Sequence, residues 1–230
     1  MLEPIWTEKP ETASRLRQRI EKILDYAKVR GYRDGENPAR WRGRLDKILP
    51  ATSKIRKVEH HAALPYAALP TFLKDLREQE GTAARAFQFA ILTAARTGEV
   101  IGARWSEIDL HAKVWTVPAG RMKAGKEHRV PLSDRALAIL AASKPRNGAA
   151  EIGQQFVFAG GKPGLSLSNM AFLMLLRRMG RGDLTAHGFR STFRDWCAER
   201  INVPSEVAEM ALAHTIVYGS DEGRTAGCRR

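Results

Sequence analysis

The fold of this chain is decided by the stretch Leu184-Thr185-Ala186-His187-Gly188-Phe189-Arg190. His187 and Arg190 stand at positions i and i+3, so on a helix their side chains share one face and one phosphate could contact both. Such a pair is weak evidence alone, because histidine and arginine also occur together on solvated helix faces. Thr185 and Ser191 are interpreted as helix caps, since neither has an acidic partner that completes a catalytic triad. The meaning of the pair therefore depends on basic residues elsewhere in the chain.

A second arginine ends an apolar helical pattern in the stretch Leu92-Thr93-Ala94-Ala95-Arg96-Thr97-Gly98-Glu99-Val100. Thr97-Gly98 is expected to break the helix, which would free Arg96 to present its forked guanidinium to a phosphate. Glu99 follows three residues later and would orient that side chain. An ordinary surface salt bridge between Arg96 and Glu99 is the alternative.

Two more basic positions are candidates for phosphate contact. Lys123, in Arg121-Met122-Lys123 at the tip of an expected hairpin, has a long stem that could reach a leaving oxygen or a backbone phosphate. A role in solubility alone is the alternative. His214, in Leu212-Ala213-His214-Thr215, ends a helical pattern, where it could bind a phosphate oxygen or favour the helix C-terminus as a cation.

The charge balance indicates a polyanionic partner. The 230 residues include 38 Lys and Arg against 25 Asp and Glu, a net charge of +13, and 43% of them are hydrophobic. The hydrophobic fraction indicates a globular chain. The excess of positive charge makes nucleic acid the first candidate partner. A membrane is disfavoured, since no stretch approaches the roughly 20 apolar residues of a spanning helix and residues 1–10 do not resemble a signal peptide. Cys197 and Cys228 are too few for a disulfide framework, which favours a reducing bacterial cytoplasm and, with the basic charge, association with the nucleoid.

The first 55 residues are predicted to form a small helical domain. Residues 12–29 carry apolar side chains at helical spacing between charged ones, which indicates an amphipathic helix with a basic outer face. A second short helix is predicted over 38–45, and residues 56–69 mix basic residues and proline without periodicity, as a linker does. The residues predicted to contact DNA are Arg15, Arg19, Lys22, Lys54, Arg56, Lys57 and, at the hairpin tip, Lys126.

Residues 70–230 are predicted to form a compact domain that is mostly α with a small antiparallel β-sheet. Residues 114–117 and 128–132 are β-rich runs joined by a turn that contains Gly and Lys, and residues 156–158 form a further short strand. Helices are predicted around residues 71–76, 82–94, 136–140, 173–176, 189–198 and 205–213.

No metal and no cofactor are expected. His60 and His61, taken with His111 or His128, lack metal-ligand spacing and a carboxylate cluster, which disfavours a metal-dependent nuclease. The glycine-rich run over 160–164 lacks the residue order of a nucleotide-binding P-loop and is predicted to be a turn.

Taken in chain order, these motifs are far more specific than any one of them. Arg96 within Thr-Gly-Glu, Lys123 within Arg-Met-Lys, His187-x-x-Arg190 and Leu-Ala-His214 resemble the constellation of the tyrosine recombinases. The similarity runs from about Glu11 to His214. The surrounding sequence resembles that of prophage integrases in the stretches His61-Ala62-Ala63-Leu64-Pro65-Tyr66, Ala103-Arg104-Trp105-Ser106-Glu107-Ile108-Asp109, Val114-Trp115-Thr116-Val117-Pro118 and His128-Arg129-Val130-Pro131-Leu132-Ser133.

This resemblance implies a helical catalytic domain with a small sheet, preceded by a helical core-binding domain that completes a clamp around DNA. The implied partner is double-stranded DNA at attachment sites, with a homo-tetramer on the DNA and a monomer when the protein is free. In the implied reaction a tyrosine hydroxyl attacks a phosphodiester and leaves a 3′-phosphotyrosine link and a free 5′-hydroxyl, with no metal or high-energy cofactor.

The resemblance also implies a role for each matched residue. Arg96 and Arg190 would hold the non-bridging phosphate oxygens in the transition state. Lys123 would be the general acid for the leaving 5′-oxygen. His187 would assist proton transfer from the nucleophile, and His214 would donate to the phosphate.

Both ends of the chain depart from the family pattern. Met1 falls where only the last helices of the core-binding domain would remain, and the family's nucleophile would fall near Gly223. The only tyrosine beyond His214 is Tyr218, in a tail over 215–230 that lacks the periodicity of a docking helix. A deletion, a frameshift or a truncated gene remnant would each produce this pattern. Two functions remain open, a site-specific recombinase with Tyr218 as its nucleophile and an inactive integrase remnant that only binds DNA.

Overall fold

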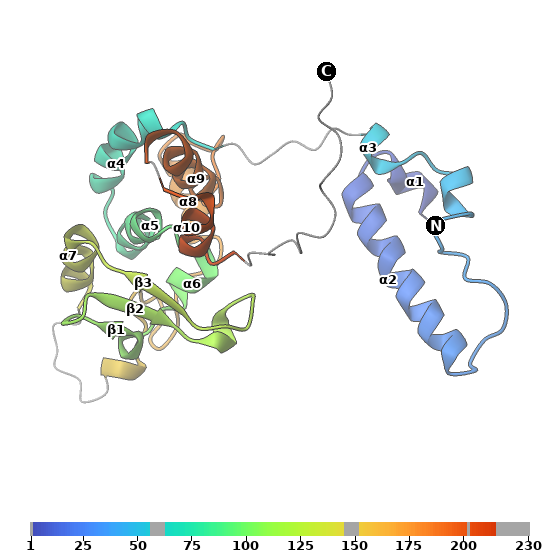
Figure 1. Cartoon of the computed structure of the whole chain (residues 1–230), viewed down its shortest axis with the longest axis horizontal. Helices are drawn as coiled ribbons and strands as arrows, with labels where there is room; N and C mark the ends of the chain where they lie inside the picture. Colours follow the sequence, from blue (N-terminus) through green and yellow to red (C-terminus); the bar gives the residue numbers. More distant parts are fainter. Residues whose placement is uncertain (1, 56–62, 145–151, 202, 215–230) are drawn as a thin grey trace, which may run out of the picture. The chain divides into compact units, whose positions relative to one another are not determined.

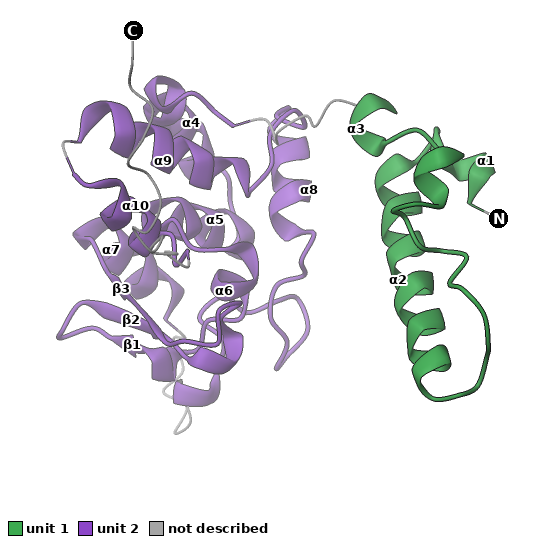
Figure 2. Cartoon of the chain, turned by 45° about the vertical axis from the view of Figure 1, so that its right-hand side comes forward, with its two compact units in different colours: residues 1–60 green, residues 61–230 purple. Residues whose placement is uncertain are grey.

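The chain divides into two compact units, unit 1 over residues 1–60 and unit 2 over residues 61–230 (Figures 1 and 2). The computed structural model describes residues 2–55, 63–144, 152–201 and 203–214. Unit 1 contains α1 Glu3–Trp6, α2 Pro10–Val29 and α3 Thr52–Ile55. Unit 2 contains α4 Leu69–Arg77, α5 Thr82–Thr93, α6 Thr97–Ile101, α7 Asp134–Ser143, α8 Ala171–Arg178, α9 Gly188–Arg200, α10 Ser205–Ala211, β1 Ile108–Asp109, β2 Val114–Val117 and β3 His128–Pro131. The prediction of a mostly α fold with a small antiparallel sheet is confirmed.

The long helix α2 is bounded as its sequence predicts. Pro10 lies in its first turn, where the missing N–H would have no helical partner anyway, and Gly31 follows its end with a φ of 71°. The buried side of α2 carries Ala13 and Arg17, whereas Ile23 is 65% exposed. The apolar stripe of α2 is therefore not what holds unit 1 together.

A polar network ties α2 to the segment that follows it. The buried Arg17 donates from Nη1 to the Ala39 carbonyl at 2.8 Å. The buried Asn37 amide donates to the α2 backbone at 2.8 Å, and its Oδ1 accepts from the Ala39 N–H at 2.9 Å. Trp41 stacks on Trp6 with ring centroids 5.5 Å apart. The three hydrogen bonds of Arg17 and Asn37 satisfy polar groups whose burial would otherwise destabilise the unit.

The prediction of a helix over 38–45 is wrong. This stretch is a series of turns that leads into the 3₁₀ helix Leu45–Lys47. Gly43 has a φ of 75°, in the left-handed region, which a right-handed helix excludes. Asn37 also binds the Ala39 N–H through its side chain, a contact found in turns as well as at helix starts, so it does not by itself predict a helix.

Unit 2 is built around α5. Gly81 precedes this helix with a φ of 93°, and buried residues occupy all sides of α5 from Ala84 to Thr93. A helix that is apolar all round belongs in the interior of a domain. The helices α4, α6, α7 and α8 accordingly contact it (Figure 1).

The sheet is antiparallel and has the strand order β1-β2-β3. Trp115 on β2 pairs with Ile108 on one side and with Val130 on the other. The predicted hairpin of β2 and β3 is confirmed, whereas β1 has two residues and is too short to show an alternating pattern. The strand predicted over 156–158 is reduced to a single bridge between Phe156 and Arg104.

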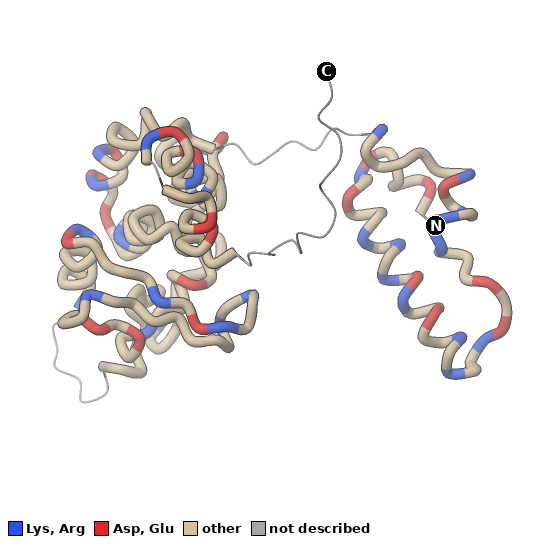
Figure 3. The backbone as a smooth tube through the Cα atoms, viewed as in Figure 1, with Lys and Arg blue, Asp and Glu red and all other residues tan. Residues whose placement is uncertain are grey.

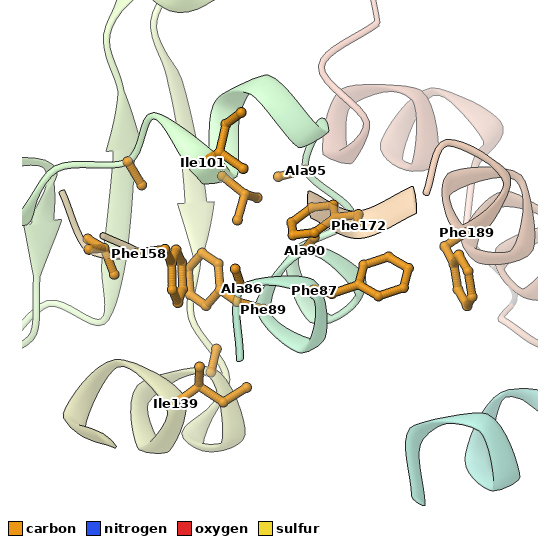
Figure 4. Close-up of a cluster of buried hydrophobic side chains, with 14 of the residues drawn as sticks. Ala86, Phe87, Phe89, Ala90, Ala95, Ile101, Ile139, Phe158, Phe172 and Phe189 are labelled. Atoms are coloured by element: carbon orange, nitrogen blue, oxygen red, sulfur yellow. The ribbon is translucent and has the colours of Figure 1, made fainter. Parts of the chain in front are cut away.

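Aromatic side chains from several helices form the core of unit 2 (Figure 4). The ring centroid of Phe87 on α5 lies 4.9 Å from that of Phe172 on α8 and 5.2 Å from that of Phe189 on α9. Phe189 also lies 4.8 Å from Phe72 on α4. These contacts fix the first turn of α9, in which Arg190 is the next residue.

Residues 63–68 pack against α9. Leu64 is buried in the core of unit 2, and its carbonyl accepts from Thr192 Oγ1 at 2.6 Å. Tyr66 donates its hydroxyl to Glu199 at 2.9 Å, and this hydrogen bond raises the pKa of Tyr66. The second half of the segment predicted to be a linker is therefore folded as part of unit 2.

Candidate active site

Arg96 lies at the break between α5 and α6. Ala94 ends α5 with a φ of 50°, in the left-handed region, and α6 begins at Thr97 with Arg96 as its N-cap. The break thus precedes Arg96, whereas the sequence pattern predicts it at Thr97-Gly98. Glu99 accepts from the backbone N–H and from Nη1 of Arg96, both at 2.8 Å. Because Glu99 is only 5% exposed, the pair is not an ordinary surface salt bridge. Glu99 caps the start of α6 by accepting from the Arg96 N–H, whereas the Arg96 guanidinium can only donate.

Arg190 is buried in the first turn of α9 and is held by the ends of two other helices. Its Nη1 donates to the carbonyl of Ala94, which ends α5, and its Nη2 donates at 2.5 Å to the carbonyl of Leu212, which ends α10. Arg96 Nη2 donates to the same Leu212 carbonyl at 3.4 Å and to the Ala213 carbonyl at 3.2 Å. Helix C-termini carry partial negative charge, which suits cationic partners. Two helix ends therefore fix two guanidinium groups close to each other.

These two arginines concentrate positive charge in a buried place. Burial, together with the like charge of Arg96, lowers the pKa of Arg190 to about 10, so Arg190 stays protonated at neutral pH. Arg190 Nε has no hydrogen-bond partner within the described part of the chain. A buried cation is destabilising unless an opposite charge comes close. An anion bound beside Arg96 and Arg190 would supply that charge.

His214 follows α10 across a sharp turn. Ala213 has a φ of 49°, and the His214 N–H donates to the Glu209 carbonyl at 2.9 Å, which closes the end of the helix. The turn brings His214 Nδ1 to 2.5 Å from Glu209 Oε2 and His214 Nε2 to 3.4 Å from Arg190 Nη2. Arg194 Nε lies 2.9 Å from the other carboxylate oxygen of Glu209. The histidine ring therefore stands between a carboxylate and an arginine.

Arg96, Lys123 and His214 line one pocket of about 260 Å³, which Ala124 and Ala213 complete. Arg190 is not a lining residue, but its Nη2 lies 3.4 Å from Nε2 of His214, which lines the pocket. The fold thus brings together four of the predicted catalytic residues. Their guanidinium, ammonium and imidazole groups are donors of the kind that bind phosphate oxygens.

The hairpin that carries Lys123 is fastened to α6 by Arg121. Arg121 Nη2 donates to Glu107 at 2.6 Å, and its Nη1 donates to the Glu99 carbonyl at 3.2 Å. Glu107 also accepts from Trp115 Nε1 at 3.0 Å. Arg121 therefore links the turn before β3, where Lys123 lies, to the helix that Arg96 caps.

His187 is not among the residues that line the pocket. It is the exposed N-cap residue of α9, and its carbonyl accepts from the Arg190 N–H at 3.0 Å. Thr185 Oγ1 accepts from the Gly188 N–H at 3.1 Å and so satisfies the first N–H of α9, as predicted, whereas Ser191 lies inside α9 and is not a cap. His187 and Arg190 thus share the first turn of one helix, with the arginine buried and the histidine exposed.

Part of the predicted DNA-binding set lies on one face of α2. Arg15, Arg19 and Lys22 are exposed there and line a hollow of about 200 Å³ with Gln18. Figure 3 shows basic residues recurring along this helix with acidic ones between them. Arg17, in contrast, is buried in unit 1 and is unavailable to DNA.

The other predicted residues are dispersed. Lys54 is exposed on α3, and Lys126 is exposed in the turn before β3. Arg56 and Lys57 lie outside the described residues, as does the candidate nucleophile Tyr218.

Sequence reasoning missed Glu209, the carboxylate that holds His214. The two residues are five apart, a spacing that does not place side chains on one helix face, and only the turn at Ala213 brings them together. Alanine rarely adopts a positive φ, so the sequence carries no marker for this turn. Glu107, which holds Arg121, was missed for a similar reason, since it precedes a strand too short to be predicted.

Within residues 2–55, 63–144, 152–201 and 203–214, no group of three or more His, Cys, Asp and Glu side chains could hold a metal ion. None of the helices in these same ranges combines the length and the apolar character that crossing a membrane requires.

Cys197 is buried on α9, and burial raises the pKa of its thiol.

Comparison with known proteins places this geometry in a family. The phage integrase family matches residues 65–217, and the phage integrase central domain matches residues 1–44. The prophage integrase IntA of Escherichia coli K12 is 35% identical over 208 residues, which cover 89% of this chain and 47% of that protein. The integrase of Shigella phage Sf6 is 30% identical over 215 residues, which cover 89% of this chain and 51% of that protein. The chain thus spans about half the length of the curated relatives it matches.

Solved structures share the fold at low sequence identity. A lambda integrase tetramer bound to a Holliday junction aligns with a TM-score of 0.67 at 17% identity, covering 96% of this chain and 64% of the lambda chain. The Tn1549 transposon integrase in complex with a circular intermediate DNA aligns with a TM-score of 0.69 at 12% identity, covering 94% of this chain and 75% of the other. Since the family match extends over most of unit 2, the chain belongs to the phage integrase family of tyrosine recombinases.

Proposed function

We propose that this chain binds double-stranded DNA and carries out site-specific recombination through a 3′-phosphotyrosine intermediate. The observation that supports this best is the pocket in which Arg96, Lys123 and His214 meet, with the buried Arg190 in contact with His214. A phosphodiester is the anion that these donors suit in a basic DNA-binding protein. The family membership supports the same reaction.

The scissile phosphate would bind beside the two arginines. Arg96 and Arg190 both donate to the Leu212 carbonyl, so their guanidinium groups are in place before the phosphate arrives. Fixed cationic donors stabilise the extra negative charge of a transition state more than the charge of the ground state. In this proposal the two arginines hold the non-bridging oxygens, and His214 lies beside them in the wall of the pocket.

One bond forms and one breaks in the cleavage step. The Tyr218 hydroxyl oxygen attacks phosphorus, and the new O–P bond replaces the bond between phosphorus and the 5′-oxygen. Lys123 gives its proton to the leaving 5′-oxygen, and His187 accepts the proton of the tyrosine hydroxyl. The phosphotyrosine link conserves the energy of the phosphodiester bond. The 5′-hydroxyl of another strand can therefore attack this link and reverse the step.

Assembly on DNA is part of the same proposal. The lambda integrase neighbour is a tetramer bound to a Holliday junction. For this chain we propose paired attachment sites as the DNA and a homo-tetramer formed on them, with a monomer free in the bacterial cytoplasm near the nucleoid. The exposed Arg15, Arg19 and Lys22 on α2 would contact the DNA backbone.

Covalent capture tests the proposal directly. Nicked duplexes prepared from the DNA that flanks the gene are incubated with the protein and separated by denaturing electrophoresis. We expect an adduct with the wild type, none with Tyr218→Phe, and an undiminished yield with Tyr32→Phe, whose side chain is exposed in unit 1. Binding of the DNA without any adduct would contradict recombination and leave the DNA-binding remnant as the function.

Replacing Arg19 and Lys22 together by alanine is expected to weaken DNA binding in a salt-dependent way. Each lost phosphate contact reduces the log–log slope of affinity against salt by about 0.9, so this double variant should lose roughly 2. Titration of labelled duplex DNA at several salt concentrations measures the slope. The control combines Arg135→Ala with Arg178→Ala, which removes two exposed charges from α7 and α8. Equal slopes for the two double variants would refute the DNA-binding role of α2.

A further inference from the structure

Glu209 is an acidic residue near the pocket that the proposed reaction does not use. Its carboxylate lies 2.5 Å from His214 Nδ1 and 2.9 Å from Arg194 Nε. The hydrogen bond with His214 and the charge of Arg194 hold the pKa of the Glu209 carboxyl below its usual value. Glu209 is therefore ionised at neutral pH and can only accept hydrogen bonds.

The partners of the His214 ring determine which nitrogen carries the proton. The Glu209 carboxylate only accepts, so Nδ1 must donate to it. Arg190 only donates, so Nε2 must accept from its Nη2 across 3.4 Å. The neutral ring with its proton on Nδ1 satisfies both contacts. In the opposite tautomer the Nδ1 lone pair would face the Glu209 carboxylate, and the Nε2–H would face an N–H of Arg190.

We propose that Glu209 is a positioning residue that holds His214 as the Nδ1–H tautomer, whose Nε2 accepts from Arg190 Nη2 and keeps that guanidinium aimed at the phosphate pocket. The inference rests on the proposed function, because that function places His214 beside the scissile phosphate. A carboxylate bound to one ring nitrogen fixes both the orientation and the tautomer of a histidine. Arg194, on α9, holds Glu209 through the second carboxylate oxygen.

Fixing the ring matters because His214 lies at the surface. Its side chain is 41% exposed, so without Glu209 the imidazole would turn between rotamers. The ring accepts from Arg190, and a guanidinium donor that is already held in place contributes more to binding, since its ordering no longer opposes the association. Loss of Glu209 therefore weakens the capture of a small anion, although Glu209 itself does not line the pocket.

Nitrogen NMR of histidine-labelled protein measures the tautomer. At about pH 8 an ordinary histidine is neutral, and the two ring-nitrogen shifts report which nitrogen is protonated. We expect the Nδ1–H form of His214 to dominate in the wild type, to decrease in Glu209→Gln, whose amide oxygen still accepts, and to give way to a mixture in Glu209→Ala. His214→Gln identifies the resonance. An unchanged tautomer in Glu209→Ala would overturn the inference, whatever the DNA assays show.

Inorganic phosphate provides a second measurement on the same variants. Its affinity is expected to fall several-fold in Glu209→Ala and less in Glu209→Gln. Glu206→Ala removes an exposed carboxylate from the same helix and should change neither measurement. Amide spectra establish that each variant is folded. Equal phosphate affinity in Glu209→Ala and the wild type would refute a role at the pocket, whereas a tautomer that responds while DNA cleavage fails would refute only the proposed function.

Discussion

Replacing Arg190 with alanine is expected to weaken phosphate binding at least about tenfold and to lower the free energy of unfolding by about 2 kcal/mol. The affinity falls because a hydrogen bond to a charged group contributes about 1.5–3 kcal/mol, and 1.4 kcal/mol is a factor of ten. The stability falls because the carbonyl of the buried Ala94 loses its donor and the carbonyl of the buried Leu212 keeps only Arg96 Nη2, at 3.4 Å. Removal of a buried cation offsets part of that loss.

Two variants separate these effects. Arg190→Lys keeps the charge but loses the forked pair of donors, so its phosphate affinity should lie between those of the wild type and Arg190→Ala. Arg135→Ala removes the same charge from the exposed face of α7 and should change stability by less than about 0.5 kcal/mol. Chemical unfolding followed by circular dichroism and titration with phosphate measure the two quantities. Phosphate affinity in Arg190→Ala as high as in Arg135→Ala would exclude Arg190 from the phosphate site.

The helices of unit 2 other than α6 could be predicted because their starts are encoded locally. Ser133 Oγ accepts from the Ala136 N–H at 3.3 Å and begins α7, and Gly81 begins α5. The conformation of residues 38–45 in unit 1 could not be predicted, because it depends on the buried Asn37 side chain and on the left-handed Gly43. Hydrophobic periodicity does not report such contacts.

The site was predictable as an ordered set of residues but not as a geometry. Arg96 and His214 each follow a turn in which an alanine, Ala94 or Ala213, takes a positive φ. Alanine in that conformation is uncommon, so neither turn has a sequence signature. The same turns aim two helix carbonyl ends at Arg190 and bring Glu209 to His214. Glu209 therefore emerges only from the fold, whereas Glu99 was predicted from its spacing to Arg96.

Replacing Glu107 with alanine is expected to lower the free energy of unfolding by about 3 kcal/mol. Glu107 is 9% exposed in its side chain and accepts from Arg121 Nη2 at 2.6 Å and from Trp115 Nε1 at 3.0 Å. Its loss leaves the Trp115 indole N–H without its acceptor and the Arg121 guanidinium without its carboxylate partner. Breaking a buried ion pair on one side costs about 3–5 kcal/mol, and we expect the lower end because Arg121 is 25% exposed and partly reached by water.

The same substitution should also loosen the hairpin that carries Lys123. Arg121 fits against α6 only because residue 102 is glycine, where a Cβ would overlap its Nη1. Without Glu107 the guanidinium keeps only the Glu99 carbonyl, at 3.2 Å, to hold it there. We therefore expect a lower phosphate affinity as well as a lower stability, with Glu107→Gln between the wild type and Glu107→Ala because its amide oxygen still accepts from Trp115 or Arg121.

A surface ion pair gives the matched comparison. Asp183→Ala breaks the contact of 3.1 Å between Arg181 and Asp183, whose side chains are 36% and 59% exposed, and such pairs contribute about 0–1 kcal/mol. Chemical unfolding of both variants should therefore separate them by about 2 kcal/mol. An equal loss of unfolding free energy in the two variants would mean that water replaces Glu107 as the partner of Arg121 at little cost. The position of Lys123 beside Arg96 would then be set by bound DNA and not by the folded chain alone.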